Sequence, residues 1–287
     1  MFGTKQNWVP MYDHNRKAGN QGDIIKHTAL IAAAETLMMQ CNGKFEYADT
    51  FAGYAFNPLT SDGEWRYGIA ATERSNHIPS TAAVTFWRDL WSCRVGLRGS
   101  VYPGSATFIL KLCLQKNLSF HARLWDTSPA VVAQLMNAFN AYEADIYPRP
   151  AKIEDFSDMK PHLLLIDPPG LRTPSKKEYP DLEDLLHFFK VTDNAILWFP
   201  ITAQGTGSPA PETEPSKAAR SQCLAHELWV TSVRWSGGIR TCGCRLAYRL
   251  SSAAGDKLRK AVDDVTALME WNRDWITHER PPNKDIN

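Results

Sequence analysis

The chain has little excess charge of either sign. Its 32 Lys and Arg residues are matched by 31 Asp and Glu residues, which leaves a formal net charge of +1 over 287 residues. A strongly basic chain would indicate a nucleic-acid partner through its overall field. Because that field is missing here, any contact with phosphate groups must come from local clusters of basic residues.

Long hydrophobic runs are also missing. The longest weakly polar stretch, Thr28 to Gln40, is interrupted by Glu35. It is far shorter than the roughly 18 residues that a membrane span needs. Residues 1–17 contain no apolar run of the length that a signal peptide has. We therefore expect a cytoplasmic protein without a membrane partner.

The cysteines lack the spacing of a metal site. None of the six belongs to a Cys-x-x-Cys pair, and none has a His at ligand spacing beside it. Only Cys242 and Cys244 are close enough to suggest a metal or redox pair. We expect reduced, packed thiols and no metal. With 44% apolar and 11% aromatic residues, the chain is long enough to bury one large core or two modest ones.

The apolar pattern predicts alternating helices and strands. Asn20 and Asp23, followed by apolar residues at three- and four-residue steps, predict a capped helix to about Gln40. Four consecutive large aliphatic residues at Leu163–Ile166 are typical of a strand that helices cover on both faces of a parallel sheet. The other predicted strands are 45–48, 120–125, 152–153 and 195–199, and the other predicted helices are 105–115, 128–142 and 256–275.

Two regions depart from this alternation. Residues 57–99 carry Trp and Arg residues on a helical pattern without a buried strand, and we interpret them as a helical insertion. Residues 228–235 and 245–250 alternate around Gly237 and Gly238, which predicts an antiparallel hairpin that closes the sheet.

Acidic residues follow the ends of the predicted strands. In open α/β sheets the ligand binds beyond the carboxyl ends of the strands. Carboxylates there can accept hydrogen bonds from ribose hydroxyls and from an exocyclic amine. One such acid could be only a turn former or a helix cap, whereas several together favour a nucleoside site. The acids are Asp49, Asp126, Asp155 (or its neighbour Glu154) and Asp167.

Two phosphate-binding motifs are absent. The loop after the first strand, residues 50–54, has a single glycine instead of the Gly-x-Gly-x-x-Gly of dinucleotide sites. No Gly-x-x-x-x-Gly-Lys-Ser/Thr motif of an NTP-binding loop occurs either. A ligand that contains adenosine but no phosphate fits better, and S-adenosylmethionine is the common one.

The tripeptide Asp167-Pro168-Pro169 is the sharpest chemical feature. Proline has no N–H and a fixed φ, so this turn presents rigid carbonyl oxygens beside a carboxylate. These acceptors can hold the hydrogens of a nucleobase amine and free its lone pair to attack a methyl sulfonium. Such positioning and preorganised electrostatics contribute several kcal/mol to catalysis. The alternative is a rigid turn after a core strand.

Several segments resemble the RlmJ-type methyltransferases, which methylate N6 of an adenine in large-subunit ribosomal RNA with S-adenosylmethionine. The resemblance implies a Rossmann-like class I methyltransferase domain over 1–56 and 100–287, with a small helical insertion subdomain over 57–99. It covers nearly the whole chain. The matching segments are YDHNRKAGNQGDIIKHT at 12–28, EYADTFAG at 46–53, YPGS at 102–105, LLLIDPP at 163–169, LWFP at 197–200 and GIRTCGCRLAYRL at 238–250.

The resemblance also implies roles for individual residues. Asp167 would be the catalytic acceptor and Pro168 would lend its carbonyl, with Tyr12, His14 and Lys26 on the substrate side. Asp126 would hold the ribose and Asp155 would lie by the adenine. Each residue also has a structural alternative, such as a satisfied helix histidine, a solvated lysine or a helix N-cap. The implied cofactor contacts are His27, Asp49, Phe51, Gly53, Ser105, Asp126, Asp155 and Asp167.

The chain departs from the family pattern at two positions. The family's Asp-Pro-Pro-Tyr ends here in Gly170, and Phe51 stands where the family has a histidine. A base stacked on an aromatic ring gains about 1–3 kcal/mol, so another ring must replace the missing one or the acceptor differs. The candidate rings are Tyr12, Tyr54, Tyr179 and Phe199.

Three groups of basic residues could surround the opening of the predicted site. Of the residues that follow the Asp-Pro-Pro turn, Arg172 and Lys176, together with Phe199, are the predicted substrate contacts. We expect an RNA substrate; DNA adenine, another amine, or a non-catalytic module that binds RNA or protein are the alternatives. The groups are Arg172, Lys176 and Lys177; Arg16, Lys17 and Lys26; and Arg66, Arg88, Arg94 and Arg98.

Overall fold

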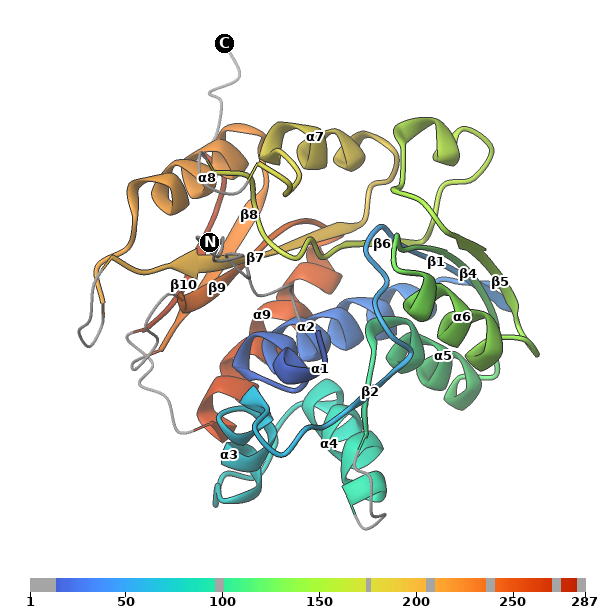
Figure 1. Ribbon diagram of the computed structural model, residues 1–287, viewed down its shortest axis with the longest axis horizontal. Coiled ribbons are helices and arrows are strands. Elements are labelled where there is room, and N and C mark those ends of the chain that lie inside the picture. The colour runs from blue at the N-terminus through green and yellow to red at the C-terminus, as the bar shows by residue number, and fades with distance from the viewer. Residues whose placement is uncertain are drawn as a thin grey trace, which may run out of the picture.

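A computed structural model describes residues 14–95, 101–173, 177–204, 210–235, 241–269 and 275–282. Its centre is a sheet of eight strands with helices on both faces (Figure 1). The strand order is β10-β8-β9-β7-β6-β1-β4-β5. The bounds are β1 Lys44–Asp49, β4 Ser119–Trp125, β5 Glu143–Tyr147, β6 Leu163–Ile166, β7 Ala195–Thr202, β8 Trp229–Arg234, β9 Thr241–Arg249 and β10 Ile276–Glu279.

The sheet is parallel over five strands and antiparallel at one end. Strands β5, β4, β1, β6 and β7 run in the same direction, and the chain order reverses between β1 and β6. This is the doubly wound arrangement, in which ligands bind at the point of reversal. Strand β9 pairs antiparallel with both β7 and β8. The predicted Rossmann-like sheet and its C-terminal antiparallel hairpin are therefore confirmed.

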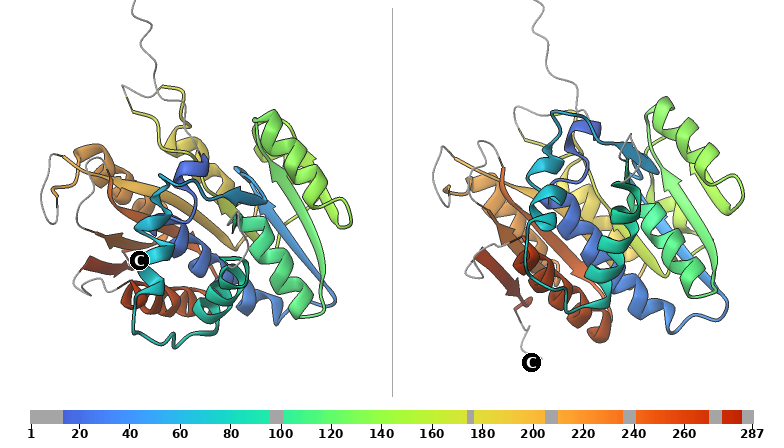
Figure 2. Two further views of the ribbon diagram at one scale, coloured as in Figure 1. Left: turned by 60° about the horizontal axis from the view of Figure 1, so that its bottom comes forward. Right: turned by 90° about the horizontal axis from the view of Figure 1, so that it is seen from below.

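Strand β6 shows why the sheet has two cores. Leu163 and Leu165 pack in one hydrophobic cluster, with helices α2 (Gln21–Met38), α5 (Ser105–Gln115) and α9 (Ser252–Leu268). Leu164 and Ile166 point to the other face and pack with α7 (Leu182–His187) and α8 (Glu214–Ala225). Figure 2 shows these two helical layers from other sides. All four side chains have no exposed surface, as the run of aliphatic residues predicts.

Helix α2 begins where its cap predicts. The side chain of Asn20 accepts a hydrogen bond from the backbone N–H of Asp23, at 3.0 Å. The helix is buried over most of its circumference, because α4, α5, α9 and the sheet all pack against it. Its first turn lies next to the carboxyl ends of the central strands.

The insertion is helical, as predicted. It contains η1 (Glu64–Arg66), α3 (Ile69–Glu73) and α4 (Ala82–Val95). Strands β2 (Phe56–Pro58) and β3 (Val101–Pro103) pair antiparallel and join its two ends, which the sequence did not predict. Trp87 and Trp91 of α4 pack in the same cluster as α2. The proposed domain boundaries stay a prediction.

Other elements differ from the prediction. The strand predicted at 152–153 is wrong, because η2 (Ile153–Phe156) occupies that region and β5 comes earlier. Helix α6 (Pro129–Ala138) is correspondingly shorter than predicted. Helix α9 ends at Leu268 instead of Trp275, and β10 was not predicted. Two short elements, α1 (His14–Lys17) and η3 (Phe188–Lys190), complete the described fold.

The described helices and cysteines bear on two further predictions, a chain without a membrane span and reduced thiols. Among the described helices, none combines the length and apolar character needed to span a membrane. The cysteines whose side chains are described are free thiols at positions 41, 113, 223, 242 and 244.

Candidate active site

Three of the four predicted acids meet at one edge of the sheet. Asp49 is the last residue of β1, and Asp126 and Asp167 directly follow the neighbouring parallel strands β4 and β6, so all three lie at the same end of the sheet. The loop after β1 is tied to both neighbours: Thr50 N–H donates to the Leu165 carbonyl at 3.1 Å, and Ala52 N–H donates to the Trp125 carbonyl at 2.9 Å.

Asp167 is paired with a buried lysine. The Nζ of Lys26 lies 2.5 Å from Oδ2 of Asp167 and 2.9 Å from Oδ1 of Asp23. The Lys26 side chain is only 5% exposed, and the ring of Trp198 lies 5.6 Å from its Nζ. Burial alone would lower the pKa of Lys26, but Asp167 and Asp23 outweigh it and hold that pKa well above its usual value. Lys26 is therefore charged.

This placement corrects one interpretation of the sequence. Lys26 was grouped with Arg16 and Lys17 as basic residues around the opening, but it is buried between two carboxylates. Arg16 and Lys17 are exposed and pair with Asp62 and Glu64. Lys26 therefore forms an ion pair with Asp167, and its burial excludes a contact with substrate phosphates.

Asp49 lies at the centre of a buried network. Its Oδ2 accepts hydrogen bonds from the Tyr47 hydroxyl at 2.9 Å and the Ser105 hydroxyl at 2.5 Å. Its Oδ1 accepts from Phe51 N–H at 3.1 Å. Burial raises the pKa of Asp49 to about 6; the charge of Asp167 adds to this rise, and the hydrogen bonds oppose it.

The loop after β1 is shaped by two glycines. Gly53 has φ of +63°, a left-handed conformation that side chains disfavour, and its N–H donates to Oδ2 of Asp126 at 3.2 Å. Gly104 precedes α5, and a Cβ placed on it would lie 2.1 Å from the Tyr54 carbonyl oxygen. These close approaches bring the loop, Asp126 and the start of α5 together. The Ser105 hydroxyl at the start of α5 donates to Asp49, so this loop, Asp126 and Asp49 are held side by side.

His27 is buried among aromatic side chains. It is 3% exposed, and its Nδ1 lies 2.9 Å from the Tyr102 hydroxyl. Its ring packs against the rings of Tyr102 and Phe108. Tyr102 also accepts a hydrogen bond from Trp87 Nε1. The structure thus places His27 in an aromatic cluster one helical position beyond Lys26.

Asp155 and Phe199 are not brought into this group. The sequence suggested that Asp155 follows a strand, which is wrong. Asp155 lies in η2 and pairs with both terminal nitrogens of Arg149. Hydrogen bonds from Arg149 hold the pKa of Asp155 below its usual value. Phe199 has no exposed surface and packs under α7 and α8. Tyr12 and Lys176 lie outside the described residues, and of His14 only the backbone is described.

An opening lies beside the chain that follows the Asp-Pro-Pro turn. A cavity of about 440 Å³ is lined by Arg172, Thr173, Lys177 and Asp181. Arg172 is held in place there, because its N–H donates to the Pro180 carbonyl and its Nε donates to the Tyr179 carbonyl, at 2.9 and 3.0 Å. Two of the predicted rim cations thus share one opening.

The ring of Tyr179 fills the space beside Gly170. A Cβ placed on Gly170 would lie 2.8 Å from Cε2 and 2.9 Å from Cδ2 of this ring. No side chain larger than hydrogen fits at position 170 unless Tyr179 moves. The chain therefore lacks an aromatic residue after Pro169 but has an aromatic ring in contact with that position.

Sequence reasoning missed three members of the site. Asp23 was noted only as part of the helix start, although its three-residue spacing to Lys26 places both on one helical face. Tyr47 lies two residues before Asp49, which puts both side chains on the same face of β1. Trp198 faces Lys26 because it alternates with the buried Phe199 along β7. Each spacing was readable in the sequence.

Comparisons with known proteins concern the fold. The sequence matches no protein-family model and no curated protein. The structure is similar to protein LPL1258 from Legionella pneumophila, with a TM-score of 0.67, 18% identity, and coverage of 93% of this chain and 99% of the other. A looser match is an rRNA methylase from Streptococcus thermophilus, with a TM-score of 0.40, 8% identity, and coverage of 78% and 96%. The first match supports the fold over almost the whole chain.

The described residues offer no metal centre. Within the ranges given above, no group of three or more His, Cys, Asp or Glu side chains is placed to hold a metal ion.

Proposed function

We propose that this protein is an S-adenosylmethionine-dependent methyltransferase that acts on N6 of an adenine in RNA. One observation carries the proposal: Asp167 directly follows the central strand β6, precedes two prolines, and is paired with the buried Lys26. A buried ion pair at a ligand-binding edge is costly to desolvate, so its presence there points to a chemical task.

The residues around Asp49 suit the cofactor. The Gly53 N–H donates to Asp126 and the Ser105 hydroxyl donates to Asp49, so two carboxylates that can accept from cationic and hydroxyl groups lie beside this loop. Ser105 and Phe51 hold Asp49 in position. S-Adenosylmethionine bound here would supply an electrophilic methyl carbon.

Asp167 and Pro168 would hold the amine that receives the methyl group. A carboxylate has about four acceptor positions, so its bond to Lys26 does not exhaust its capacity. The charged Lys26 lies beside Asp167, and an ionised carboxylate only accepts hydrogen bonds. The rigid Pro168 carbonyl provides the second acceptor. Together they would orient the amine lone pair and stabilise the positive charge that develops on nitrogen during transfer.

An RNA acceptor is supported by the rim of the site. Arg172 and Lys177 line the opening that follows the Asp-Pro-Pro turn, where they could contact phosphates. An enzyme that modifies a base must remove it from the stack, which costs least in single strands and loops. The sequence resemblance to RlmJ-type enzymes favours adenine in ribosomal RNA. DNA adenine is the second candidate, because Gly170 departs from the family pattern.

Methyl transfer to different nucleic acids tests the proposal. Transfer of a labelled methyl group would be measured with deproteinised ribosomal RNA, duplex DNA and single-stranded DNA, followed by nucleoside analysis of the product. We expect N6-methyladenosine from the RNA. As a matched pair, Asp167→Asn should abolish transfer, whereas Asp184→Asn on the exposed surface of α7 should not change it. If calorimetry detects no binding of S-adenosylmethionine, the proposal is contradicted and a non-catalytic module is favoured.

A further inference from the structure

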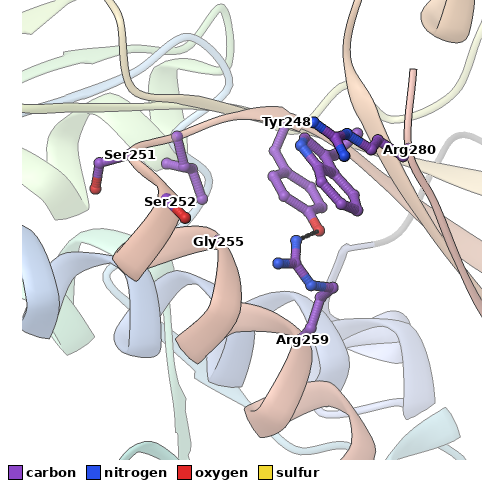
Figure 3. Close-up of a pocket in the computed structure, with 8 residues that line it drawn as sticks. Tyr248, Ser251, Ser252, Gly255, Arg259 and Arg280 are labelled. Carbon is purple, nitrogen blue, oxygen red and sulfur yellow. Dashed lines mark hydrogen bonds between the residues drawn. The ribbon is translucent and has the colours of Figure 1, made fainter. Parts of the chain in front are cut away.

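A second cavity lies at the opposite edge of the sheet from Asp167. Arg249 ends β9 and pairs with Ala195, which begins β7, so the chain after Arg249 is at the amino end of the parallel strands. A cavity of about 260 Å³ opens there between β8, β9, β10 and the first turns of α9 (Figure 3). Its lining residues are Trp229, Tyr248, Leu250, Ser251, Ser252, Gly255, Arg259 and Arg280.

The lining carries two positive charges and no carboxylate. Arg259 is fixed in place: its guanidinium carbon lies 4.2 Å from the centre of the Trp229 ring, and its NH1 donates to the Tyr248 hydroxyl at 3.0 Å. Asp256 also pairs with Arg259 but does not line the cavity. Because Arg259 is already ordered, a ligand would lose little entropy in contacting it.

Arg280 supplies the second charge from the end of β10. Figure 3 shows its side chain reaching toward Tyr248. In the part of the chain that the structure describes, its guanidinium has no hydrogen-bond or ion-pair partner. Two guanidinium groups around one small cavity attract an anion, and their planar forks match phosphate better than a simple point charge does.

Gly255 keeps the cavity open. It lies inside α9, where glycine costs about 1 kcal/mol relative to alanine. A Cβ placed on it would meet Arg259 NH1 at 3.5 Å and Tyr248 Cε2 at 3.6 Å, which are ordinary contacts. Packing therefore does not require glycine here. An alanine methyl would occupy space between two of the lining side chains.

We propose that this cavity binds the phosphate group of a small phosphorylated molecule. Cavities for drug-sized ligands usually measure about 300–1,000 Å³, so this one suits a ligand of the size of a mononucleotide or smaller. Arg259 and Arg280 bind the phosphate, and the hydroxyls of Tyr248 and Ser252 add hydrogen bonds. The site is separate from the proposed methyl-transfer centre, at the other end of the strands.

Calorimetric titration of the full chain tests the site. The probes are inorganic phosphate, adenosine monophosphate and a six-residue oligouridylate. We expect saturable binding of phosphate and of the mononucleotide. Arg280→Ala should weaken both at least tenfold, and Gly255→Ala should weaken both while leaving the thermal midpoint equal or higher. Arg74→Ala, which removes an exposed arginine of the insertion, is the matched control and should change neither.

Three outcomes would overturn the assignment. The first is no saturable heat with phosphate or the mononucleotide. The second is binding that Arg280→Ala and Gly255→Ala leave unchanged. The third is binding of the oligouridylate alone, lost in Arg280→Ala, which would assign the cavity to a nucleic-acid backbone. None of these results depends on S-adenosylmethionine binding, so the proposed methyl transfer stands or fails separately.

Discussion

The ammonium group of Lys26 lies 2.5 Å from Asp167, although the two residues are 141 positions apart in the chain. This contact joins the start of α2 to the turn after β6. It also places a buried positive charge directly beside the carboxylate. The N-terminal segment of the sequence and the Asp-Pro-Pro turn therefore form one chemical unit.

Asp167→Asn should abolish methyl transfer without unfolding the chain. The amide keeps the shape of the carboxyl group but loses the charge that would stabilise the developing cation on the amine. Removing one preorganised electrostatic group commonly lowers kcat by about 10²–10³-fold. Single-turnover transfer, with circular dichroism as the folding control, measures this. Activity within a factor of two of the wild type would show that another group accepts the amine.

Lys26→Met should destabilise the protein and should be partly rescued by a second change. It leaves Asp23 and Asp167 facing each other without their shared cation. Breaking a buried ion pair from one side costs about 3–5 kcal/mol. Adding Asp167→Asn removes one of the unpaired charges, so the double variant should be more stable than the sum of the single effects predicts. Urea unfolding of all four proteins gives the coupling energy; strict additivity would contradict the pairing.

The sequence predicted the sheet where burial dictates the pattern. Leu163–Ile166 and the helix capped by Asn20 are buried, so apolar periodicity alone identified them. It failed at β5, an edge strand whose Glu143 and Asp145 are charged, as edge strands often are. These charged residues also fit the pattern of the preceding helix, so the sequence predicts that the helix continues to Tyr142.

The site was predictable only in part for a related reason. The acids after β1, β4 and β6 follow from strand direction, which a sequence pattern reveals. The burial of Lys26 does not follow in the same way, because it depends on which helix packs over the end of β6. Tyr179 likewise owes its position to a tertiary contact with Gly170.

Asp49 should make stability depend on pH between about 4 and 6. Burial raises the pKa of its carboxyl in the folded state to about 6, above the ordinary value of 3.8. The folded state therefore binds a proton more tightly than the unfolded state. Below the pKa that Asp49 has in the unfolded state, this difference contributes about 3 kcal/mol to the free energy of unfolding. The contribution is lost as the pH rises through the pKa that Asp49 has in the folded state.

The difference between the wild type and Asp49→Asn isolates this contribution. Urea unfolding of both proteins at several pH values from 4 to 7.5 gives the free energy of unfolding. We expect the wild type to lose stability relative to the variant as the pH rises. Parallel curves would show that Asp49 has the same pKa in the folded and unfolded states.

Cofactor affinity should have the opposite pH dependence. A cationic amino group bound beside Asp49 favours its ionised form, so below about pH 6 binding must first remove a proton. The dissociation constant of S-adenosylmethionine should then rise up to tenfold per pH unit as the pH falls from 6 to 5. Calorimetry of the wild type should show this rise, and Asp49→Asn should bind weakly with a flat profile. An equal slope in both proteins would exclude Asp49 as the contact.

Exchanging Gly170 and Tyr179 tests whether the Tyr179 ring serves the substrate. Gly170→Tyr alone should impair folding or activity, because its Cβ would lie 2.8 Å from the Tyr179 ring. Tyr179→Gly alone removes the ring and should weaken adenine substrates by about 1–3 kcal/mol, or roughly 5–150-fold in kcat/KM. The double variant places a ring directly after Pro169 in the space that Tyr179 has left. We expect it to recover most of the activity, whereas Tyr179→Phe, which keeps the stacking face, should stay near the wild type. A double variant no better than Tyr179→Gly would mean that the ring at this position only packs the turn.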